Sequence, residues 1–221
     1  MKTYTLFFIS LFFCLTVYCQ DSLYLVGTIT GESTTNPIKN VKGVGDINGD
    51  GYEDFMIAQG DTTVKVYFGS ASMDLNEDIV LRPNSTMKKV FAFGGDIEGV
   101  GDVNGDGYND FLISAGFRDY GYVNGIVFLY YGGALIDTIP SVEFHDDWIE
   151  DAFGSPIVAL NDINKDGYND FAIGSPYNWT NGRGYIYLFY GGNDITWDKR
   201  LTFTCPNLNQ LEETEFGKSI A

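Results

Sequence analysis

The stretch DVNGDGYND at residues 102–110 decides the fold of this 221-residue chain, because it occurs in three copies. It recurs as DINGDGYED at 46–54 and as DINKDGYND at 162–170, so all copies follow the pattern D-x-N-x-D-G-x-x-D. Carboxylate or amide oxygens recur at every second position, and a glycine then allows a sharp bend before the last aspartate. The apolar runs FMIA, FLIS and FAIG follow directly and favour buried strands. The pattern therefore predicts a repeated unit of strand, polar loop and strand.

The alternating oxygen side chains predict a Ca²⁺ site in each loop, because Ca²⁺ takes roughly six to eight oxygen ligands at ~2.3–2.6 Å. The candidate ligands are the side chains at positions one, three, five and nine and the main-chain carbonyl at position seven. They are Asp46, Asn48, Asp50, Tyr52 and Asp54; Asp102, Asn104, Asp106, Tyr108 and Asp110; and Asp162, Asn164, Asp166, Tyr168 and Asp170. We expect about three structural Ca²⁺ per chain. Intervening positions such as Asn109 are expected to contribute little.

The alternative interpretation is a set of metal-free turns, since Asn, Asp and Gly favour turns by themselves. Three carboxylates in one short loop repel one another unless a cation compensates them. Identical spacing in three copies, with the same Tyr after the Gly, favours the cation site.

The acidic composition limits the possible partners. The chain has 13 basic and 30 acidic residues, for a net charge of −17. Nucleic acid is therefore not an expected partner. Direct membrane insertion is not expected either, because no segment after the first nineteen residues is long enough to span a bilayer.

Residues 1–19 are predicted to be a secretory signal peptide. Lys2 supplies the positive start, an apolar core runs from Leu6 to Val17, and Cys19 suits the last position before cleavage. Cys205 would then remain as a single cysteine, so no intrachain disulfide would be available. We therefore expect a secreted, extracellular or cell-surface protein that is stabilised by Ca²⁺ rather than by disulfides.

The polar loop belongs to a longer repeat of roughly sixty residues. A Phe-Gly pair precedes the second and third loops and recurs near the end of the chain, at Phe93–Gly94, Phe153–Gly154 and Phe216–Gly217. Each unit has room for four short strands, which the third unit places at roughly 154–161, 170–174, 184–190 and 199–204. Four strands in a repeat of this length predict the blade of a β-propeller.

The order of Phe-Gly, D-x-N-x-D-G-x-x-D and apolar strand resembles the FG-GAP repeats of the integrin α-subunit N-terminal β-propeller and of many secreted bacterial proteins. The resemblance covers roughly residues 40–221. The first unit lacks Phe-Gly, and IAQG, ISAG and IGSP match the Gly-Ala-Pro part of the repeat only partly. The resemblance implies an all-β fold in which each FG-GAP blade is a four-stranded antiparallel sheet.

The repeat divides the chain into segments that follow the signal peptide. We expect a lead-in strand within 20–39, blade 1 at 40–92, blade 2 at 93–152, blade 3 at 153–213 and the start of a fourth blade at 214–221. By resemblance, three blades and a start would be a fragment of a ring of about seven blades.

The resemblance also implies a non-enzymatic recognition or adhesion module, with a protein or carbohydrate ligand on the rim opposite the calcium loops. Two connections expected at that rim, 116–125 and 175–184, carry aromatic and basic side chains: Phe117, Arg118, Tyr120, Tyr122, Tyr177, Trp179 and Arg183. Such side chains suit sugar stacking or a protein contact. The alternative is that the rings pack over the edges of their own blades.

The alternative function is the propeller scaffold of a secreted enzyme, such as a polysaccharide lyase or a lipid-cleaving hydrolase. Such an enzyme would require a cluster of Arg, His, Lys or Tyr in the central channel, or a further hydrolase domain. The single histidine, His145, is expected at the surface. The sequence has no nucleophile elbow, no H-E-x-x-H and no phosphate-binding glycine loop, so no catalytic residue is assigned.

Overall fold

The computed structural model describes residues 6–7, 14–19, 22–34, 36–83, 90–119, 122–145, 152–176, 184–204 and 218–220. Side chains are described from residue 27 onward, except at 117–123. Within these segments the chain forms strands and one short 3₁₀ helix at Trp197–Lys199. No helix in the described part of the chain is long and apolar enough to cross a membrane.

Three antiparallel sheets correspond to the three sequence units. The first consists of β4 (Ile38–Gly45), β5 (Asp54–Gln59), β6 (Thr63–Tyr67) and β7 (Ile79–Leu81). The second consists of β9 (Ile97–Gly101), β10 (Asp110–Asp119), β11 (Tyr122–Tyr130) and β12 (Val142–His145), with β8 (Val90–Phe91) also paired to β10. The third consists of β13 (Ile157–Asn161), β14 (Asp170–Ser175), β15 (Tyr185–Phe189) and β16 (Leu201–Thr204). Apart from β8, each strand of a sheet pairs with the next, so that the four-stranded blade expected from the sequence is confirmed.

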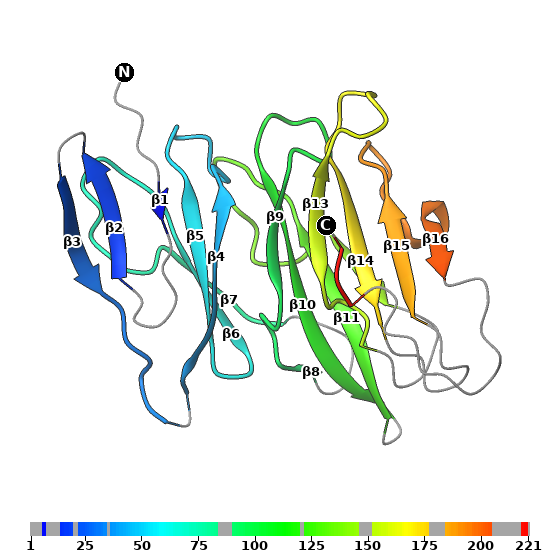
Figure 1. The fold of residues 1–221 in the computed structure, drawn as a ribbon, viewed down its shortest axis with the longest axis horizontal. Coiled ribbons are helices and arrows are strands. Elements are labelled where there is room, and N and C mark those ends of the chain that lie inside the picture. The colour runs from blue at the N-terminus through cyan, green and yellow to red at the C-terminus, as the bar shows by residue number, and fades with distance from the viewer. Residues whose placement is uncertain are drawn as a thin grey trace.

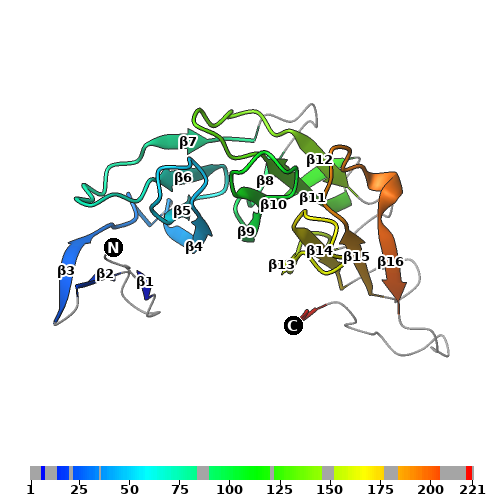
Figure 2. The same cartoon turned by 90° about the horizontal axis from the view of Figure 1, so that it is seen from above.

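The three sheets stand side by side in an arc, with β4, β9 and β13 on its inner side and β7, β12 and β16 on its outer side (Figure 2). This is the radial arrangement of propeller blades. A further antiparallel sheet of β1 (Leu6–Phe7), β2 (Cys14–Cys19) and β3 (Ser22–Thr28) lies at the N-terminal end of the arc (Figure 1). Strand β3 falls within the expected lead-in segment, while the signal peptide and the blade limits stay predictions.

The two largest hydrophobic clusters lie between neighbouring blades. Along β10, Phe111 and Ile113 pack into the cluster shared with the first blade, whereas Leu112 faces the cluster shared with the third. Successive strand residues point to opposite faces of a sheet, so the middle blade serves two cores. Phe93 and Phe153, from the Phe-Gly pairs, are 1% and 3% exposed within these two clusters.

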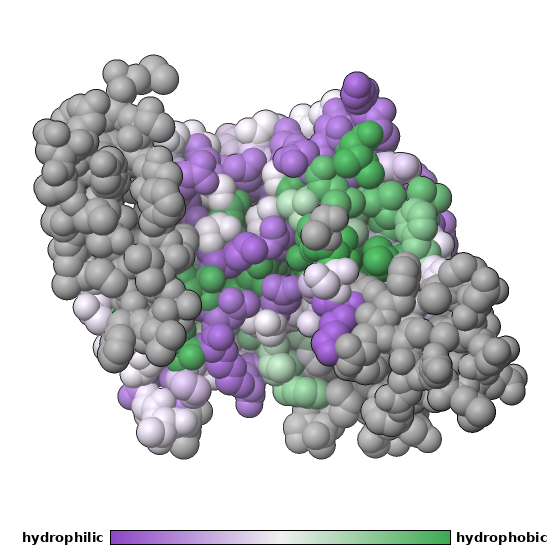
Figure 3. Space-filling model, viewed as in Figure 1, coloured by the Kyte–Doolittle hydropathy of each residue, from purple (hydrophilic) through white to green (hydrophobic). Residues whose placement is uncertain are grey.

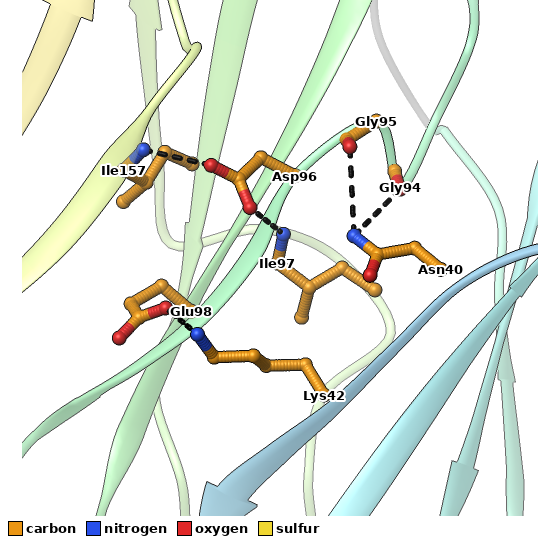
Figure 4. A network of polar contacts seen from close by, with 8 residues as sticks. All are labelled: Asn40, Lys42, Gly94, Gly95, Asp96, Ile97, Glu98 and Ile157. Atoms are coloured by element: carbon orange, nitrogen blue, oxygen red, sulfur yellow. Dashed lines mark hydrogen bonds and ion pairs between the residues drawn. The ribbon is translucent and has the colours of Figure 1, made fainter. Parts of the chain in front are cut away.

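Polar contacts join the inner strands of all three blades (Figure 4). Lys42 on β4 forms an ion pair with Glu98 on β9. The carboxylate of Asp96, directly before β9, accepts a hydrogen bond from the N–H of Ile157 on β13 at 2.8 Å. Burial raises the pKa of Asp96, while its main-chain hydrogen bonds and the charge of Lys42 oppose that rise. The blades are thus fixed to one another by both apolar and polar contacts.

On the face of the arc drawn in Figure 3, the hydropathy of the surface changes from the middle of the arc towards the third blade. Hydrophilic residues run across the middle of the arc, whereas hydrophobic surface gathers over β13 and β14. In the third of the polar loops, Ile163 is 50% exposed. The equivalent Ile47 and Val103 are fully buried under the following blade.

One sequence expectation about the rim is wrong. Residues 116–125 were expected to form a loop, but most of them belong to β10 and β11, with Gly116 opposite Gly125 and Asp119 opposite Tyr122. The connection is therefore a tight hairpin that lengthens the second blade. The side chains of Phe117, Arg118 and Tyr122 lie outside the described residues. So do residues Tyr120, Tyr177, Trp179 and Arg183.

Candidate metal centres

The three acidic loops connect equivalent strands: β4 to β5, β9 to β10 and β13 to β14. Because the strand order is the same in each antiparallel sheet, all three loops lie at one rim of the arc, at the top of Figure 1. The fold therefore brings all fifteen candidate ligands to the same rim, in three groups of five.

Side-chain oxygens of the first loop are hydrogen-bonded to the main chain of the loop itself. One oxygen of Asp46, Oδ1, accepts from the N–H groups of Gly49 (2.7 Å) and Asp50 (3.1 Å). Its other oxygen, Oδ2, accepts from Gly51 at 2.8 Å, where φ is +89° and a Cβ would be strained. The side chain of Asn48 meets that of Asp50, with 3.0 Å between Nδ2 and Oδ2.

The second and third loops repeat this arrangement closely. The bonds from the sixth-position glycine to the first aspartate measure 2.8 Å for Gly107 to Asp102 and 3.0 Å for Gly167 to Asp162. In each loop the N–H of the tyrosine also donates to the carboxylate of the fifth-position aspartate. The loop conformation is thus a repeated feature and not an accident of one copy.

The last aspartate of each loop has a different role, because it is fully buried. Asp54 accepts hydrogen bonds from the N–H groups of Ile47 (2.9 Å) and Gly69 (2.7 Å). Asp110 and Asp170 make the same two contacts in their own blades. This carboxylate therefore ties the loop to the turn after the third strand of its blade.

Burial raises the pKa of Asp54 and that of Asp110 to about 7. The two main-chain hydrogen bonds to each carboxylate oppose the rise, and the other aspartates of the same loop add to it. An ionised carboxylate at these positions is therefore unfavourable unless a positive charge lies nearby.

The donor set of each loop fits a hard divalent cation in kind. Carboxylate, amide and main-chain carbonyl oxygens are the ligands that Ca²⁺ prefers, and a carboxylate that accepts two hydrogen bonds keeps spare lone pairs. Among the described residues, no three Asp, Glu, His or Cys side chains converge into a ready-made group. An Asn side chain and a main-chain carbonyl would complete each set, and the loop would need to close around the ion.

Sequence reasoning missed the role of the eighth position. Asn109 was expected to contribute little, but it is half-buried against the preceding blade. Its N–H donates to the carbonyl of Asp46 at 3.3 Å, and its side chain lies against Gly45. The N–H of Asn169 likewise donates to the carbonyl of Asp102, at 2.9 Å. These contacts join neighbouring loops along the rim.

The single histidine of the chain lies at the end of the second blade. His145 is exposed at the end of β12, and its charge acts on the neighbouring Glu143, whose pKa is raised mainly by burial. The exposure of His145 agrees with the surface position expected from the sequence.

Comparison with known proteins identifies the repeat. The FG-GAP repeat family matches residues 94–130 and 153–189, which contain the second and third loops with their flanking strands. Integrin alpha-V of Gallus gallus is 30% identical over 158 residues, covering 67% of this chain and 15% of the relative. Integrin alpha-PS2 of Drosophila melanogaster is 34% identical over 117 residues, covering 49% of this chain and 8% of the relative. Integrin alpha-8 of Mus musculus is 35% identical over 133 residues, covering 57% of this chain and 12% of the relative.

The chain therefore contains FG-GAP repeats, and integrin alpha subunits are among its homologues. The resemblance that the loops and Phe-Gly pairs indicated is confirmed. The chain spans at most 15% of the length of the three relatives named above.

Proposed function

We propose that this chain is a calcium-binding β-propeller module for recognition or adhesion, secreted or held at the cell surface. The observation that carries the proposal is the repetition of one oxygen-rich loop, with the same hydrogen bonds, at one rim of blades homologous to integrin alpha subunits. The module is non-enzymatic, and the cation is structural.

The candidate ligands have defined roles in this proposal. In the first site, Asp46, Asn48, Asp50 and Asp54 would provide side-chain oxygens, and Tyr52 would provide its main-chain carbonyl. The other two loops would use their equivalent residues, giving about three Ca²⁺ per chain. A bound cation would favour the ionised form of the last aspartate, whose burial otherwise disfavours it. It would also reduce the repulsion within a chain of net charge −17.

The ligand, a protein or a carbohydrate, is proposed to bind at the rim opposite the calcium loops. Among the described residues, the second blade extends further on that side than the first, because β10 has ten residues where β5 has six. The resulting β10–β11 hairpin extends below the other strands in Figure 1. The hairpin therefore projects beyond the end of the first blade, and we expect a partner to bind where the two blades differ in length.

Removal of calcium is expected to destabilise the protein. With dissociation constants of roughly 10⁻⁴–10⁻³ M, each site would add about 1.4 kcal/mol at ten times its Kd. Three such sites would raise the melting temperature by on the order of 10 °C in a domain of this size. Thermal melting followed by circular dichroism, in excess EGTA and in 10 mM Ca²⁺, measures this shift. Coincident melting curves, together with no heat in a calorimetric titration, would contradict structural calcium sites.

A further inference from the structure

The first acidic loop is held in place by the second blade through two main-chain hydrogen bonds. The N–H of Asn109 donates to the carbonyl of Asp46 at 3.3 Å, and the N–H of Gly133 donates to the carbonyl of Ile47 at 2.8 Å. The third blade holds the second loop by the equivalent pair, from Asn169 to Asp102 at 2.9 Å and from Gly192 to Val103 at 2.7 Å. Both bonds act on the start of the loop, where its first candidate ligand lies.

Side chains of the second blade also press directly on the first loop. A methyl group at Gly45 would collide with the side chain of Asn109, and one at Gly49 would collide with the ring of Tyr108. The contact repeats one blade further along, where Gly101 meets the side chain of Asn169 and Gly105 meets the ring of Tyr168. The main chain that carries ligand positions one and three is therefore enclosed by the next blade.

The third loop shows that these glycines serve the contact and not only the backbone. Its equivalent positions have positive φ as well, yet they are occupied by Asn161 (φ +53°) and Lys165 (φ +64°). A side chain is thus tolerated there when no following blade covers the loop within the described residues. The half-exposed Ile163, against the fully buried Ile47 and Val103, marks the same difference.

The first blade lacks the two residue types with which the second and third blades hold the preceding loop. The position of Asn109 is occupied there by Glu53, and the position of Gly133 by Ser70; both are exposed. Among the described residues, no acidic loop precedes the first blade for these groups to hold. Asn and Gly therefore occupy these two positions in the blades that contact a preceding acidic loop, and other residues occupy them in the first blade.

We propose that a cation site of this protein is completed across a blade boundary, an inference that rests on the calcium sites proposed above. Tyr108 and Asn109 are positioning residues for the 46–54 site, and Tyr168 and Asn169 are positioning residues for the 102–110 site. By fixing the main chain between Gly45 and Gly49, the next blade reduces the ordering that cation binding must supply. Because coupling is reciprocal, a bound cation in turn strengthens the contact between the blades.

The test separates the sites by location. Hydrogen–deuterium exchange of the full chain, read by mass spectrometry during a Ca²⁺ titration, gives a midpoint for peptides from each loop. Asn109→Ala keeps the main-chain hydrogen bond to Asp46 and removes the side chain that lies against Gly45. In this variant the midpoint of the 46–54 peptide is expected to rise about fivefold or more, while that of 102–110 changes less than about twofold. In Asn169→Ala, the large change moves to the 102–110 peptide. In the matched control Glu53→Ala, which removes only a solvent-exposed charge at the same loop position, all three midpoints change less than about twofold.

The outcomes distinguish this inference from the proposed function. A wild-type chain whose loops gain no protection from Ca²⁺ overturns the calcium sites themselves. If the wild-type loops respond to Ca²⁺ but Asn109→Ala raises only the midpoint of 102–110, or no midpoint, the two-blade site alone is overturned. If Asn109→Ala loses protection throughout β5 and β14, the variant does not fold properly, and Tyr108→Leu replaces it as the test of the two-blade site. It keeps the main-chain carbonyl of position seven, and it must still raise the midpoint of the 46–54 peptide.

Discussion

Replacing Phe153 by alanine is expected to lower the free energy of unfolding by about 3–5 kcal/mol, the usual range for a buried Phe. The side chain is 3% exposed and lies in the core shared by the second and third blades. Its ring makes edge contacts with Tyr187 (5.8 Å between centroids) and Trp197 (5.5 Å). Removing it leaves a cavity at the boundary of two blades, which cannot close without moving one of them.

Urea unfolding followed by circular dichroism, in saturating Ca²⁺, measures this loss. Leu135→Ala is the control, because Leu135 is 95% exposed and its removal should change stability by no more than about 0.5 kcal/mol. Similar losses in the two variants would show that the Phe-Gly phenylalanine is not part of a core between blades.

Replacing Asp110 by alanine should also be strongly destabilising, and it should remain so without calcium. The buried carboxylate accepts from the N–H groups of Val103 and Gly132, and each donor left without a partner costs about 1–3 kcal/mol. The exposed Asp106 also accepts hydrogen bonds within its loop, but water can replace them, so its loss should cost little without Ca²⁺ and much more with it.

The comparison of Asp110→Ala with Asp106→Ala, each in EGTA and in 10 mM Ca²⁺, separates the two roles. Asp110→Ala should melt well below the wild type in both buffers. Asp106→Ala should melt close to the wild type in EGTA and fall behind it in Ca²⁺. Equal behaviour in EGTA would mean that the ninth-position aspartate does not hold the loop to the blade.

Local pattern accounts for much of what the sequence predicted correctly. The loops, the buried strands after them and the four strands of the third unit are each marked by short-range spacing, and β13 to β16 fall close to the expected positions. The contacts of Asn109 could not be read in this way, because they depend on the position of a loop sixty or so residues earlier. The first copy of the loop has Glu53 at the position of Asn109, and this difference was the available signal that the position has a role.

The hairpin of β10 and β11 was missed for a related reason. Gly116 and Gly125 read as turn residues, whereas in the fold they are opposite one another in a ladder. The ring of Phe91 lies where a side chain at Gly116 would be, and the carbonyl of Phe153 lies where one at Gly125 would be. These glycines allow other segments to approach the strands closely, and such approaches leave no local pattern.

Counting bound calcium decides whether the three repeated loops are cation sites. Equilibrium dialysis against 5 mM Ca²⁺, followed by atomic emission of the protein sample, gives the number of ions per chain. We expect about three for the wild type and about two for Asp106→Ala, which loses one central ligand. A wild-type chain that binds no calcium, or a variant that binds as much as the wild type, would contradict this expectation.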